Sequence, residues 1–179
     1  MTQQSNFAID RAVTSTLDAQ PIVDIHTHLC PLSMPDLALY GPDELVTYHY
    51  LKAETSRQLP PGISVAEFNG MAKPAQADVI WKALFVGDSS PVSEAQLGIV
   101  TVMSALGLDP RAPDLAEFRQ FCSRMPPEDY FDMVFDKAGV ATVYMTNDPL
   151  DALEGPVWKK GIDLDPRFKA VLRLDSALM

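Results

Sequence analysis

The sequence is poor in cysteine, which excludes a fold held together by disulfides. Cys30 and Cys122 are its two cysteines, they lie far apart in the 179 residues, and neither belongs to a CxxC pattern. Disulfide scaffolds and structural zinc modules need several closely spaced cysteines. This cysteine content is typical of a reducing compartment, and we expect a cytoplasmic protein.

Basic residues are also few. The chain has 14 Lys and Arg against 24 Asp and Glu, which gives a formal net charge of -10 at pH 7. Binding to a nucleic-acid backbone requires clustered positive charge, and the sequence contains no Lys/Arg run or basic helix face. We therefore expect no nucleic-acid partner.

Long apolar runs are missing as well. The apolar stretch "LGIVTVMSALGL" is interrupted by Gly, Ser and Thr and is too short to span a bilayer. The first residues, "MTQQSNFAIDRAV", lack the basic start and apolar core of a signal peptide. With 47% hydrophobic and 21% charged residues, the composition is that of one globular domain with a substantial core and no membrane partner.

Three segments have the composition of β-strands. Residues 21–29 ("PIVDIHTHL") and 140–148 ("VATVYMTND") are rich in β-branched residues, and residues 168–175 ("FKAVLRLD") alternate between two faces. A short helix is expected over residues 8–18, before the first strand, and another within residues 149–162. The alternation of strands and helices favours a parallel sheet.

The segment between the first two strands is predicted to be mainly helical. The sequences "SVAE" at 64–67 and "SEAQ" at 93–96 fit capping boxes at helix starts. Residues 59–92 contain Pro and Gly breaks and fit either a lid or a scaffold. The expected helices are residues 42–57, a helix from the second capping box to Gly107, residues 113–125, and residues 127–138 ending at Gly139.

The first strand carries the motif "DIHTH". Side chains alternate along a strand, so His26 and His28 face the same way, and Asp24 shares their parity. Two imidazoles on one face can bind a metal ion such as Zn²⁺, with Asp24 orienting a ligand. The alternative is a histidine pair on an exposed strand. The apolar neighbours favour a buried strand and therefore the metal site, although a catalytic zinc ion needs a third protein ligand.

The third histidine, His49, lies in "TYHYLK" between Tyr48 and Tyr50. Both residue types can donate and accept protons and can bind sugar hydroxyls. Aromatic core packing around a hydrogen-bonded histidine is the simpler interpretation, and the residues alone favour it.

Polar residues also follow the second and third strands. Arg173 can hold a carboxylate through two hydrogen bonds or can form a surface ion pair with Asp175, and the two interpretations are equally supported. Asn147 and Asp148 stand where barrel enzymes build their sites. The sequence "NDP" also forms turns, and we favour the turn.

Several of these stretches together resemble one family. "PIVDIHTHLCP" resembles the first barrel strand of the amidohydrolase superfamily, and within it the chain is most similar to uronate (glucuronate) isomerase. The other supporting stretches span nearly the whole chain: "DELVTYHYLKAE", "QADVIWKALF", "SPVSEAQLGIVTVMSALGLDP", "VYMTNDPLD" and "FKAVLRLD". The resemblance implies an α/β fold, about the first three strands of a (β/α)8 TIM-type barrel. A long, mainly helical insertion would follow strand 1, at about residues 36–138 of a single domain covering residues 1–179.

The resemblance also implies a reaction and roles for residues. The family interconverts D-glucuronate and D-fructuronate by proton transfer, an aldose–ketose isomerisation of hexuronate catabolism. His26 and His28 match metal ligands, for a divalent ion such as Zn²⁺. His49 and Tyr50 match a catalytic pair near the sugar, with Tyr50 also in contact with the substrate. Arg173 matches an arginine suited to the substrate carboxylate.

The chain departs from the family after its third strand. The late histidine and the last-strand Asp and Arg that complete the family's site have no counterpart, and we expect an N-terminal fragment that is inactive alone. The full-length protein could form a homo-oligomer. The alternatives are a metal-dependent hydrolase of the same superfamily, and a non-catalytic module that binds a metal or a partner. Arg173 and the His-Tyr pair favour an acidic sugar over the hydrolase.

Overall fold

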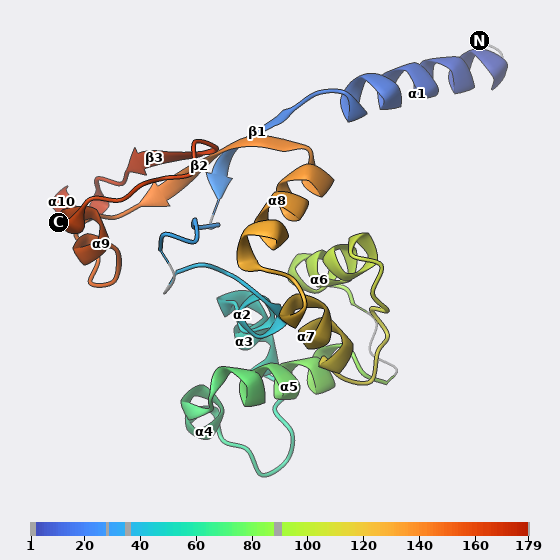
Figure 1. The fold of residues 1–179 in the computed structure, drawn as a ribbon. Helices are drawn as coiled ribbons and strands as arrows, with labels where there is room; N and C mark the ends of the chain where they lie inside the picture. Colours follow the sequence, from blue (N-terminus) through green and yellow to red (C-terminus); the bar gives the residue numbers. More distant parts are fainter. Residues whose placement is uncertain (1–2, 28, 35–36, 88–90, 179) are drawn as a thin grey trace. The chain divides into compact units, whose positions relative to one another are not determined.

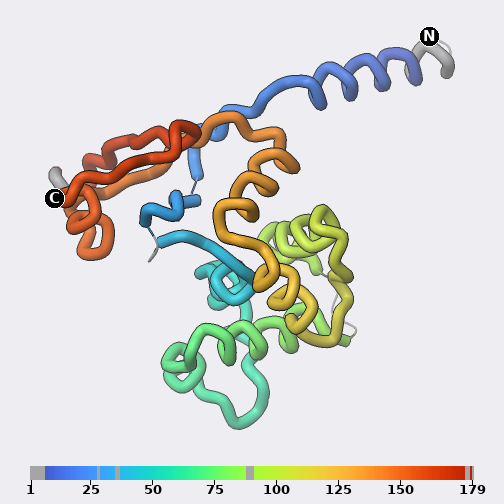
Figure 2. The backbone as a smooth tube through the Cα atoms, viewed as in Figure 1, coloured from blue at the N-terminus to red at the C-terminus, as the bar shows by residue number. Residues whose placement is uncertain are grey.

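The computed structural model describes residues 3–27, 29–34, 37–87 and 91–178. The chain forms two compact units, whose elements are labelled in Figure 1. The sheet unit comprises residues 1–38 and 131–179, and the helical unit comprises residues 39–130. Figure 2 follows the chain from the first strand in blue, through the helical unit in cyan to yellow, to the last strands in orange and red.

The sheet unit contains three parallel strands, as the sequence predicts. The strands β1 (Ile22–Thr27), β2 (Val140–Asn147) and β3 (Phe168–Leu172) pair in the order β1-β2-β3. β2 and β3 keep an unbroken register from the pair Val143–Phe168 to the pair Asn147–Leu172. Because the strands are parallel, the residues that follow their carboxyl ends lie along one edge of the sheet.

β1 is more exposed than the sequence suggests. Ile22, Val23 and Ile25 expose 49%, 53% and 81% of their surface, so the expectation of a buried first strand is wrong for this chain. The reason is the strand order: within the described residues, β1 is an edge strand whose one partner is β2. Apolar side chains on an edge strand are buried only where further elements cover them.

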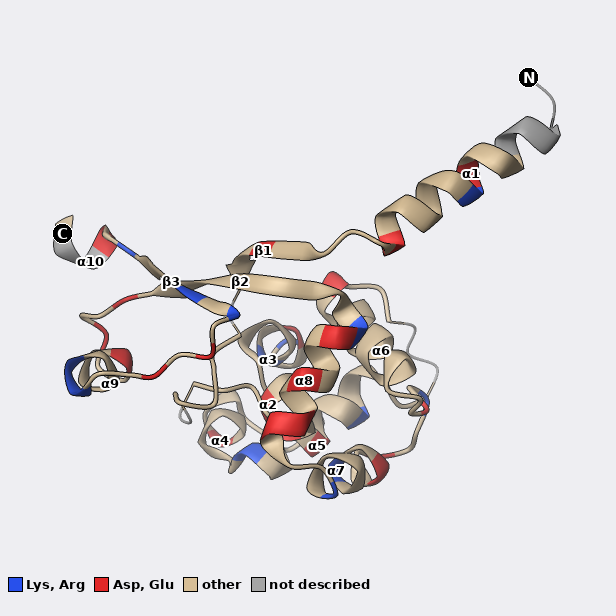
Figure 3. Cartoon of the chain, turned by 45° about the horizontal axis from the view of Figure 1, so that its top comes forward, with Lys and Arg blue, Asp and Glu red and all other residues tan. Residues whose placement is uncertain are grey.

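Four helices accompany the strands in sequence: α1 (Gln3–Asp18), α8 (Pro127–Ala138), α9 (Glu154–Lys160) and α10 (Asp175–Leu178). α8 begins in the helical unit and continues into the sheet unit. It ends before Gly139, whose φ of 63° is accessible to glycine without steric cost, so the predicted C-terminus is confirmed. Acidic residues at the start of α8 and lysines at the end of α9, red and blue in Figure 3, complement the helix dipoles.

An aromatic cluster joins α8 to the sheet. Phe168 at the start of β3 is 3% exposed, and its ring centroid lies 6.5 Å from that of Phe131 and 5.4 Å from that of Phe135. The guanidinium of Arg167 lies 4.5 Å from the Phe135 ring centroid and also forms an ion pair with Asp132 of α8. Burial of these rings stabilises the packing of α8 against the sheet.

The core of the helical unit includes one face of the helix α5 (Lys73–Leu84). Trp81 stacks on Phe85 with ring centroids 4.5 Å apart, and its indole N–H donates a hydrogen bond to the Ala112 carbonyl at 3.0 Å. The helix α5 contacts α2 (Pro42–Val46) and α3 (His49–Thr55). The helices of the unit that precede α8 are α2 (Pro42–Val46), α3 (His49–Thr55), α4 (Val65–Gly70), α5 (Lys73–Leu84), α6 (Glu94–Ala105) and α7 (Ala116–Ser123).

Two helix predictions need correction. The single helix predicted over residues 42–57 is two helices, because Tyr48 has an extended backbone with φ −60° and ψ 144°. The Thr47 hydroxyl donates to the Asp43 carbonyl at 2.6 Å, a local bond that competes with the helix ladder. The helix α5 lies within residues 59–92, where the sequence analysis predicted a helix start at 64–67 but no helix over residues 73–84. Its N-cap, Ala72, has no capping side chain, so it lacks the signal that marks α4 and α6.

The two predicted capping boxes have different outcomes. At α4, Ser64 and Glu67 exchange both hydrogen bonds, and the box is confirmed. At α6, Ser93 accepts from the Gln96 N–H, but the Gln96 side chain accepts from Val92 instead, so one half of the box is present. None of the helices in the described part of the chain is long and apolar enough to cross a membrane.

Candidate functional site

His26 lies at the carboxyl end of β1, in an irregular part of the strand pairing. Asp24 pairs with Val143 and Thr27 pairs with Met145, so β1 contains one residue more than β2 over this stretch. Such a bulge interrupts the alternation of side chains. The parity rule that predicted the direction of His26 therefore does not apply here, and His26 is exposed.

The described residues do not assemble a three-ligand metal site by themselves. Across residues 3–27, 29–34, 37–87 and 91–178, no group of three or more His, Cys, Asp or Glu side chains is placed to hold a metal ion. The second predicted ligand, His28, lies outside the described residues. The Oδ1 atom of Asp24 accepts a hydrogen bond from the His26 backbone N–H at 3.0 Å, so it closes a local turn.

One carboxylate organises the carboxyl end of β2. The Oε2 atom of Glu154 accepts hydrogen bonds from Asn147 Nδ2 at 3.3 Å, from the Asp148 backbone N–H at 3.0 Å and from Trp158 Nε1 at 3.3 Å. The Asn147 carbonyl in turn accepts from the Arg173 backbone N–H at 2.8 Å. Glu154 thus holds the ends of β2 and α9 together, next to the end of β3.

Asp148 follows β2, and Cys30 follows β1. The Oδ1 atom of Asp148 accepts from the Leu150 N–H at 3.0 Å, which is the local turn expected of "NDP". Burial raises the pKa of the Cys30 thiol to about 11, with the negative charge of Glu154 as a second, smaller cause. Cys30 follows β1 in the sequence, and its side chain is half-buried.

Arg173 forms the ion pair that the sequence offered as one of its two interpretations. Its Nε donates to Asp175 Oδ2 at 2.6 Å, and the two side chains are 53% and 62% exposed. This hydrogen bond raises the pKa of Arg173. The contact occupies one donor of the guanidinium, and the role of Arg173 in binding a substrate carboxylate stays a prediction.

His49 and Tyr50 begin α3 in the helical unit, and Tyr48 precedes them. The ring centroid of His49 lies 4.2 Å from that of Tyr48 and 4.1 Å from that of Tyr50. The contact between the rings agrees with the aromatic-packing interpretation, but that interpretation placed the rings in the core. His49 is exposed and Tyr50 is 56% exposed, so this packing is on the surface and not in the core.

His49 and Tyr50 line different hollows of the helical unit. Neighbouring residues on a helix point about 100° apart, so the two side chains point in different directions. Tyr50 lines a hollow of about 460 Å³ with Glu54 and Glu94. The residues that line the second hollow, of about 320 Å³, include His49, Tyr48, Thr47, Glu44, Lys52 and Lys73.

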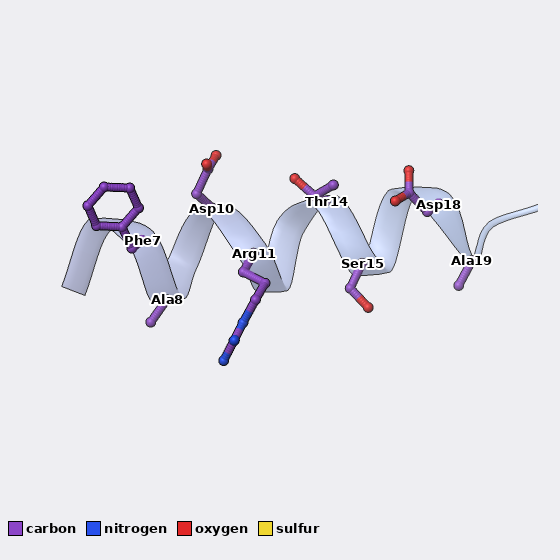
Figure 4. Close-up of a pocket in the computed structure, with 8 residues that line it drawn as sticks. All are labelled: Phe7, Ala8, Asp10, Arg11, Thr14, Ser15, Asp18 and Ala19. Carbon is purple, nitrogen blue, oxygen red and sulfur yellow. The ribbon is translucent and has the colours of Figure 1, made fainter. Parts of the chain in front are cut away.

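A third hollow lies along α1 and does not form a ligand site. Its volume is about 900 Å³, and all of its lining residues fall within residues 7–19. Figure 4 shows Phe7 and Asp10 on one side of this helix and Arg11 and Ser15 on the other. Residues 7–20 are exposed. A surface built from one helix lacks the opposing wall that buries a ligand.

The sequence analysis missed Glu154 and Lys52. Glu154 is one acid among several in the segment 149–162, and no spacing marks it as the acceptor of three donors. Lys52 shares a hollow with Lys73 and Glu44, which come from other helices. The surroundings of Glu154 and of Lys52 depend on contacts between residues that folding brings together, so no local sequence pattern predicts them.

Comparison with solved structures finds a similar protein. No protein-family model matches the chain, and no curated protein matches it. A solved structure, a uronate isomerase from Bacillus halodurans, is 40% identical in sequence with a TM-score of 0.87. The match covers 99% of this chain and 41% of that protein, so the chain spans less than half of the protein it resembles.

Proposed function

We infer that this chain is part of a uronate isomerase. One observation carries the inference: sequence and fold match the same solved isomerase over nearly the whole chain, in both the sheet unit and the helical unit. An identity of this size over nearly all of the chain supports shared chemistry as well as shared architecture. We therefore assign the chain to a cytoplasmic enzyme that acts on a small-molecule hexuronate.

The activity belongs to a longer molecule in this proposal, because the chain spans less than half of its structural relative. The three parallel strands would be the first strands of a (β/α)8 barrel, and about residues 36–138 would be a helical insertion into one domain. A complete barrel takes roughly 250 residues. The 179 residues alone would therefore lack part of the site and would be inactive.

The proposed reaction is an aldose–ketose isomerisation. In the open-chain hexuronate, the C–H bond at C2 is acidic because it lies beside the C1 carbonyl. A base removes the C2 proton, the electrons form an enediol, and a proton returns to C1 to give the ketohexuronate. The site must supply a base, an acid at the carbonyl oxygen and stabilisation of the developing negative charge.

His49 and Tyr50 are our candidates for proton handling near the sugar. Both are exposed at the start of α3, and their rings are in contact. Tyr50 would also bind a sugar hydroxyl, and Arg173 would bind the substrate carboxylate at the end of β3. We place the principal base outside these 179 residues.

His26 and His28 would hold a divalent metal ion, of which Zn²⁺ is the first candidate. Imidazole nitrogen suits borderline ions, and His26 is exposed at the carboxyl end of its strand. A metal bound there would polarise substrate oxygens. The remaining ligands would come from other strands of the complete barrel.

The test is an assay of the full-length protein with D-glucuronate. We expect conversion to D-fructuronate, measured by NMR, and one deuterium at C1 of the product when the reaction runs in D₂O. The variants His49→Gln and Tyr50→Phe should each lower kcat, by roughly 100-fold or more where the residue transfers a proton. Lys82→Met, an exposed change on α5, should leave kcat as in the wild type.

Two outcomes would contradict the proposal. Hydrolysis of esters, amides or lactones without isomerisation would identify a hydrolase that uses metal-activated water. A full-length protein with neither activity, which binds a metal or another protein instead, would identify a non-catalytic module.

A further inference from the structure

The carboxylate of Glu154 holds two consecutive residues at the end of β2. Its Oε2 atom accepts hydrogen bonds from the Asn147 side-chain amide at 3.3 Å and from the Asp148 backbone N–H at 3.0 Å. Glu154 is itself held at the start of α9, because its backbone N–H donates to the Asp151 carboxylate at 3.0 Å. Hydrogen bonds to a charged acceptor are stronger than neutral ones. Charge-assisted bonds therefore tie the end of β2 to the first turn of α9.

The two residues that Glu154 holds both act on Arg173, which follows the last residue of β3. The Asn147 carbonyl accepts a hydrogen bond from the Arg173 backbone N–H at 2.8 Å. The pKa of the Arg173 guanidinium is raised first by the hydrogen bond and charge of Asp175, and then by the negative charge of Asp148. Asn147 thus holds the backbone of Arg173, and Asp148 acts on its side chain.

The side-chain contact of Arg173 does not fix its position against the sheet. Its ion pair is with Asp175, two residues further along the same segment, and both side chains are more than half exposed. An exposed ion pair of this kind contributes little stability, and the two partners move together with their segment. The Asn147–Leu172 pair ends the register of β2 and β3. The bond from Arg173 to Asn147 is therefore the link between the sheet and the residues after β3.

Asn147 is suited to transmit the effect of Glu154. Its side chain is 3% exposed, and its Oδ1 atom has no hydrogen-bond partner within the described residues. Without Glu154, the buried amide would lose an acceptor for its Nδ2 group as well, and a buried polar group without partners is costly. Removing the Glu154 carboxylate should therefore displace Asn147, and with it the backbone bond to Arg173.

We propose that Glu154 is a positioning residue for Arg173. It fixes the end of β2 through Asn147 and Asp148, and the end of β2 fixes the backbone that carries the guanidinium. This inference rests on the proposed isomerase function, in which Arg173 binds the substrate carboxylate; Glu154 acts through Arg173 and not by contact with the sugar. The two hydrogen bonds between a guanidinium and a carboxylate require an accurate geometry, so a small displacement of Arg173 weakens substrate binding.

The experiment is a double-mutant cycle in the full-length protein with Glu154→Ala and Arg173→Met. We expect Glu154→Ala to raise KM for D-glucuronate by about tenfold, as the weakening of a charge-assisted hydrogen bond does, with kcat within about threefold. In the Arg173→Met background, Glu154→Ala should change KM by less than about twofold, because the residue through which it acts is gone. The same factor in both backgrounds overturns the proposal.

Two further variants separate positioning from general stabilisation. Trp158→Phe removes the third donor to Glu154, the indole N–H at 3.3 Å, and leaves both bonds to the end of β2 in place. It should keep KM within about twofold of the wild type, even where urea unfolding shows a loss of stability. Glu154→Gln keeps an acceptor oxygen without the charge, so its KM should lie between those of the wild type and Glu154→Ala.

Hydrogen exchange of the full-length protein, read at single residues by mass spectrometry, tests the position of Arg173 without activity. In Glu154→Ala, the Arg173 N–H should exchange faster by about tenfold or more. The control is the Val143 N–H, which donates to the Arg167 carbonyl at the other end of the strand pairing and should exchange as in the wild type. Unchanged exchange at Arg173 overturns the proposal. If both amides exchange faster, the fold as a whole is weakened, and Glu154→Gln then decides by the same comparison.

The two measurements distinguish a failure of this proposal from a failure of the proposed function. If the full-length protein does not isomerise D-glucuronate, the isomerase function fails, and faster exchange confined to Arg173 still supports the positioning role of Glu154. If D-glucuronate is isomerised but Glu154→Ala leaves both KM and the exchange at Arg173 as in the wild type, the positioning role fails and the function stands.

Discussion

Glu154 is the residue on which the carboxyl edge of the sheet depends. One of its oxygens accepts three hydrogen bonds, from the Asn147 amide, the Asp148 backbone and the Trp158 indole. Asn147 is 3% exposed, and its Oδ1 atom has no partner within the described residues, so Glu154 is the side chain that holds this amide in place. Hydrogen bonds to a charged acceptor are stronger than neutral ones.

The thiol of Cys122 is predicted to be unreactive in the folded protein. The side chain is 4% exposed, and burial, with the charge of Asp43 as a second cause, raises the thiol pKa from 9.0 to about 11. The thiolate is the reactive species, so at pH 8 its fraction falls by roughly 100-fold. Alkylation by iodoacetamide, followed at the Cys122 peptide by mass spectrometry, should be slower by at least that factor than in the urea-unfolded chain.

The variant Asp43→Asn is the matched test of the second cause. It removes the charge of Asp43 and with it the ion pair to Arg119 of α7, so the comparison is made once circular dichroism shows the wild-type fold. Burial is the larger cause of the raised pKa, so alkylation should accelerate by much less than 100-fold. Equal rates in the folded and unfolded wild type would show that burial does not protect this thiol.

At the scale of elements, the break between α2 and α3 sets the surroundings of His49. A continuous helix would place residues 44, 48 and 52 along one side of a single rod. Instead the extended backbone of Tyr48 turns the chain, and the rings of residues 48–50 gather at the start of a new helix. The hollow lined by α2, α3 and α5 is a consequence of this break.

The junction of β2 and α9 depends on a glycine. A Cβ atom on Gly155 would lie 2.8 Å from the Pro149 carbonyl oxygen, closer than packed atoms approach, and that oxygen belongs to the backbone. Gly155→Ala should therefore displace the loop before α9 and destabilise the protein by about 1–3 kcal/mol, as overpacking does. Urea unfolding of wild type and variant measures the difference.

Gly98→Ala is the control for this change. Gly98 lies within α6, and no atom outside its own helix backbone and chain neighbours lies within 4 Å of the position that a Cβ atom would occupy there. Alanine has the higher helix propensity, so this variant should be more stable by about 0.5–1 kcal/mol. If both variants shifted stability in the same direction, the close contact at Gly155 would not be the cause.

At the scale of the whole molecule, the apolar surface of the sheet is the dominant feature. Ile22, Val23 and Ile25 on one edge strand and Val171 and Leu172 on the other are each at least 45% exposed. Unpaired strand edges with apolar side chains favour association between chains. In the proposed full-length barrel, further strands would cover this surface.

We expect the 179-residue chain, expressed by itself, to bind the dye ANS and to elute from size exclusion as associated species. The full-length protein should do neither to the same extent. Ile25→Lys, which puts a charge on the 81% exposed edge position, should reduce association of the short chain. Leu97→Lys on α6, 50% exposed in the helical unit, should leave it unchanged. A short chain that is monomeric and free of bound dye would contradict the prediction.

The elements of the fold were predictable where their signals are local. β-branched composition marked β1 and β2, Gly139 marked the end of α8, and Ser64 with Glu67 marked the start of α4. Each of these signals acts between residues close in sequence, through backbone geometry or one hydrogen bond. Helix α5, without a capping side chain, lacked such a signal and was missed.

The sequence by itself determined the parallel sheet, the helical segment between its first two strands, and the residue types with which a site can be built, among them His26, His49 and Arg173. Tertiary structure decided what those residues meet: Arg173 contacts Asp175, and His49 shares a hollow with Lys52. It also placed Asn147, Asp148 and Trp158 around Glu154. The physical reason is the range of the interactions. Strand and helix preferences act between neighbours in the chain, whereas the pairing of charges and the shape of a hollow follow from the packing of distant segments.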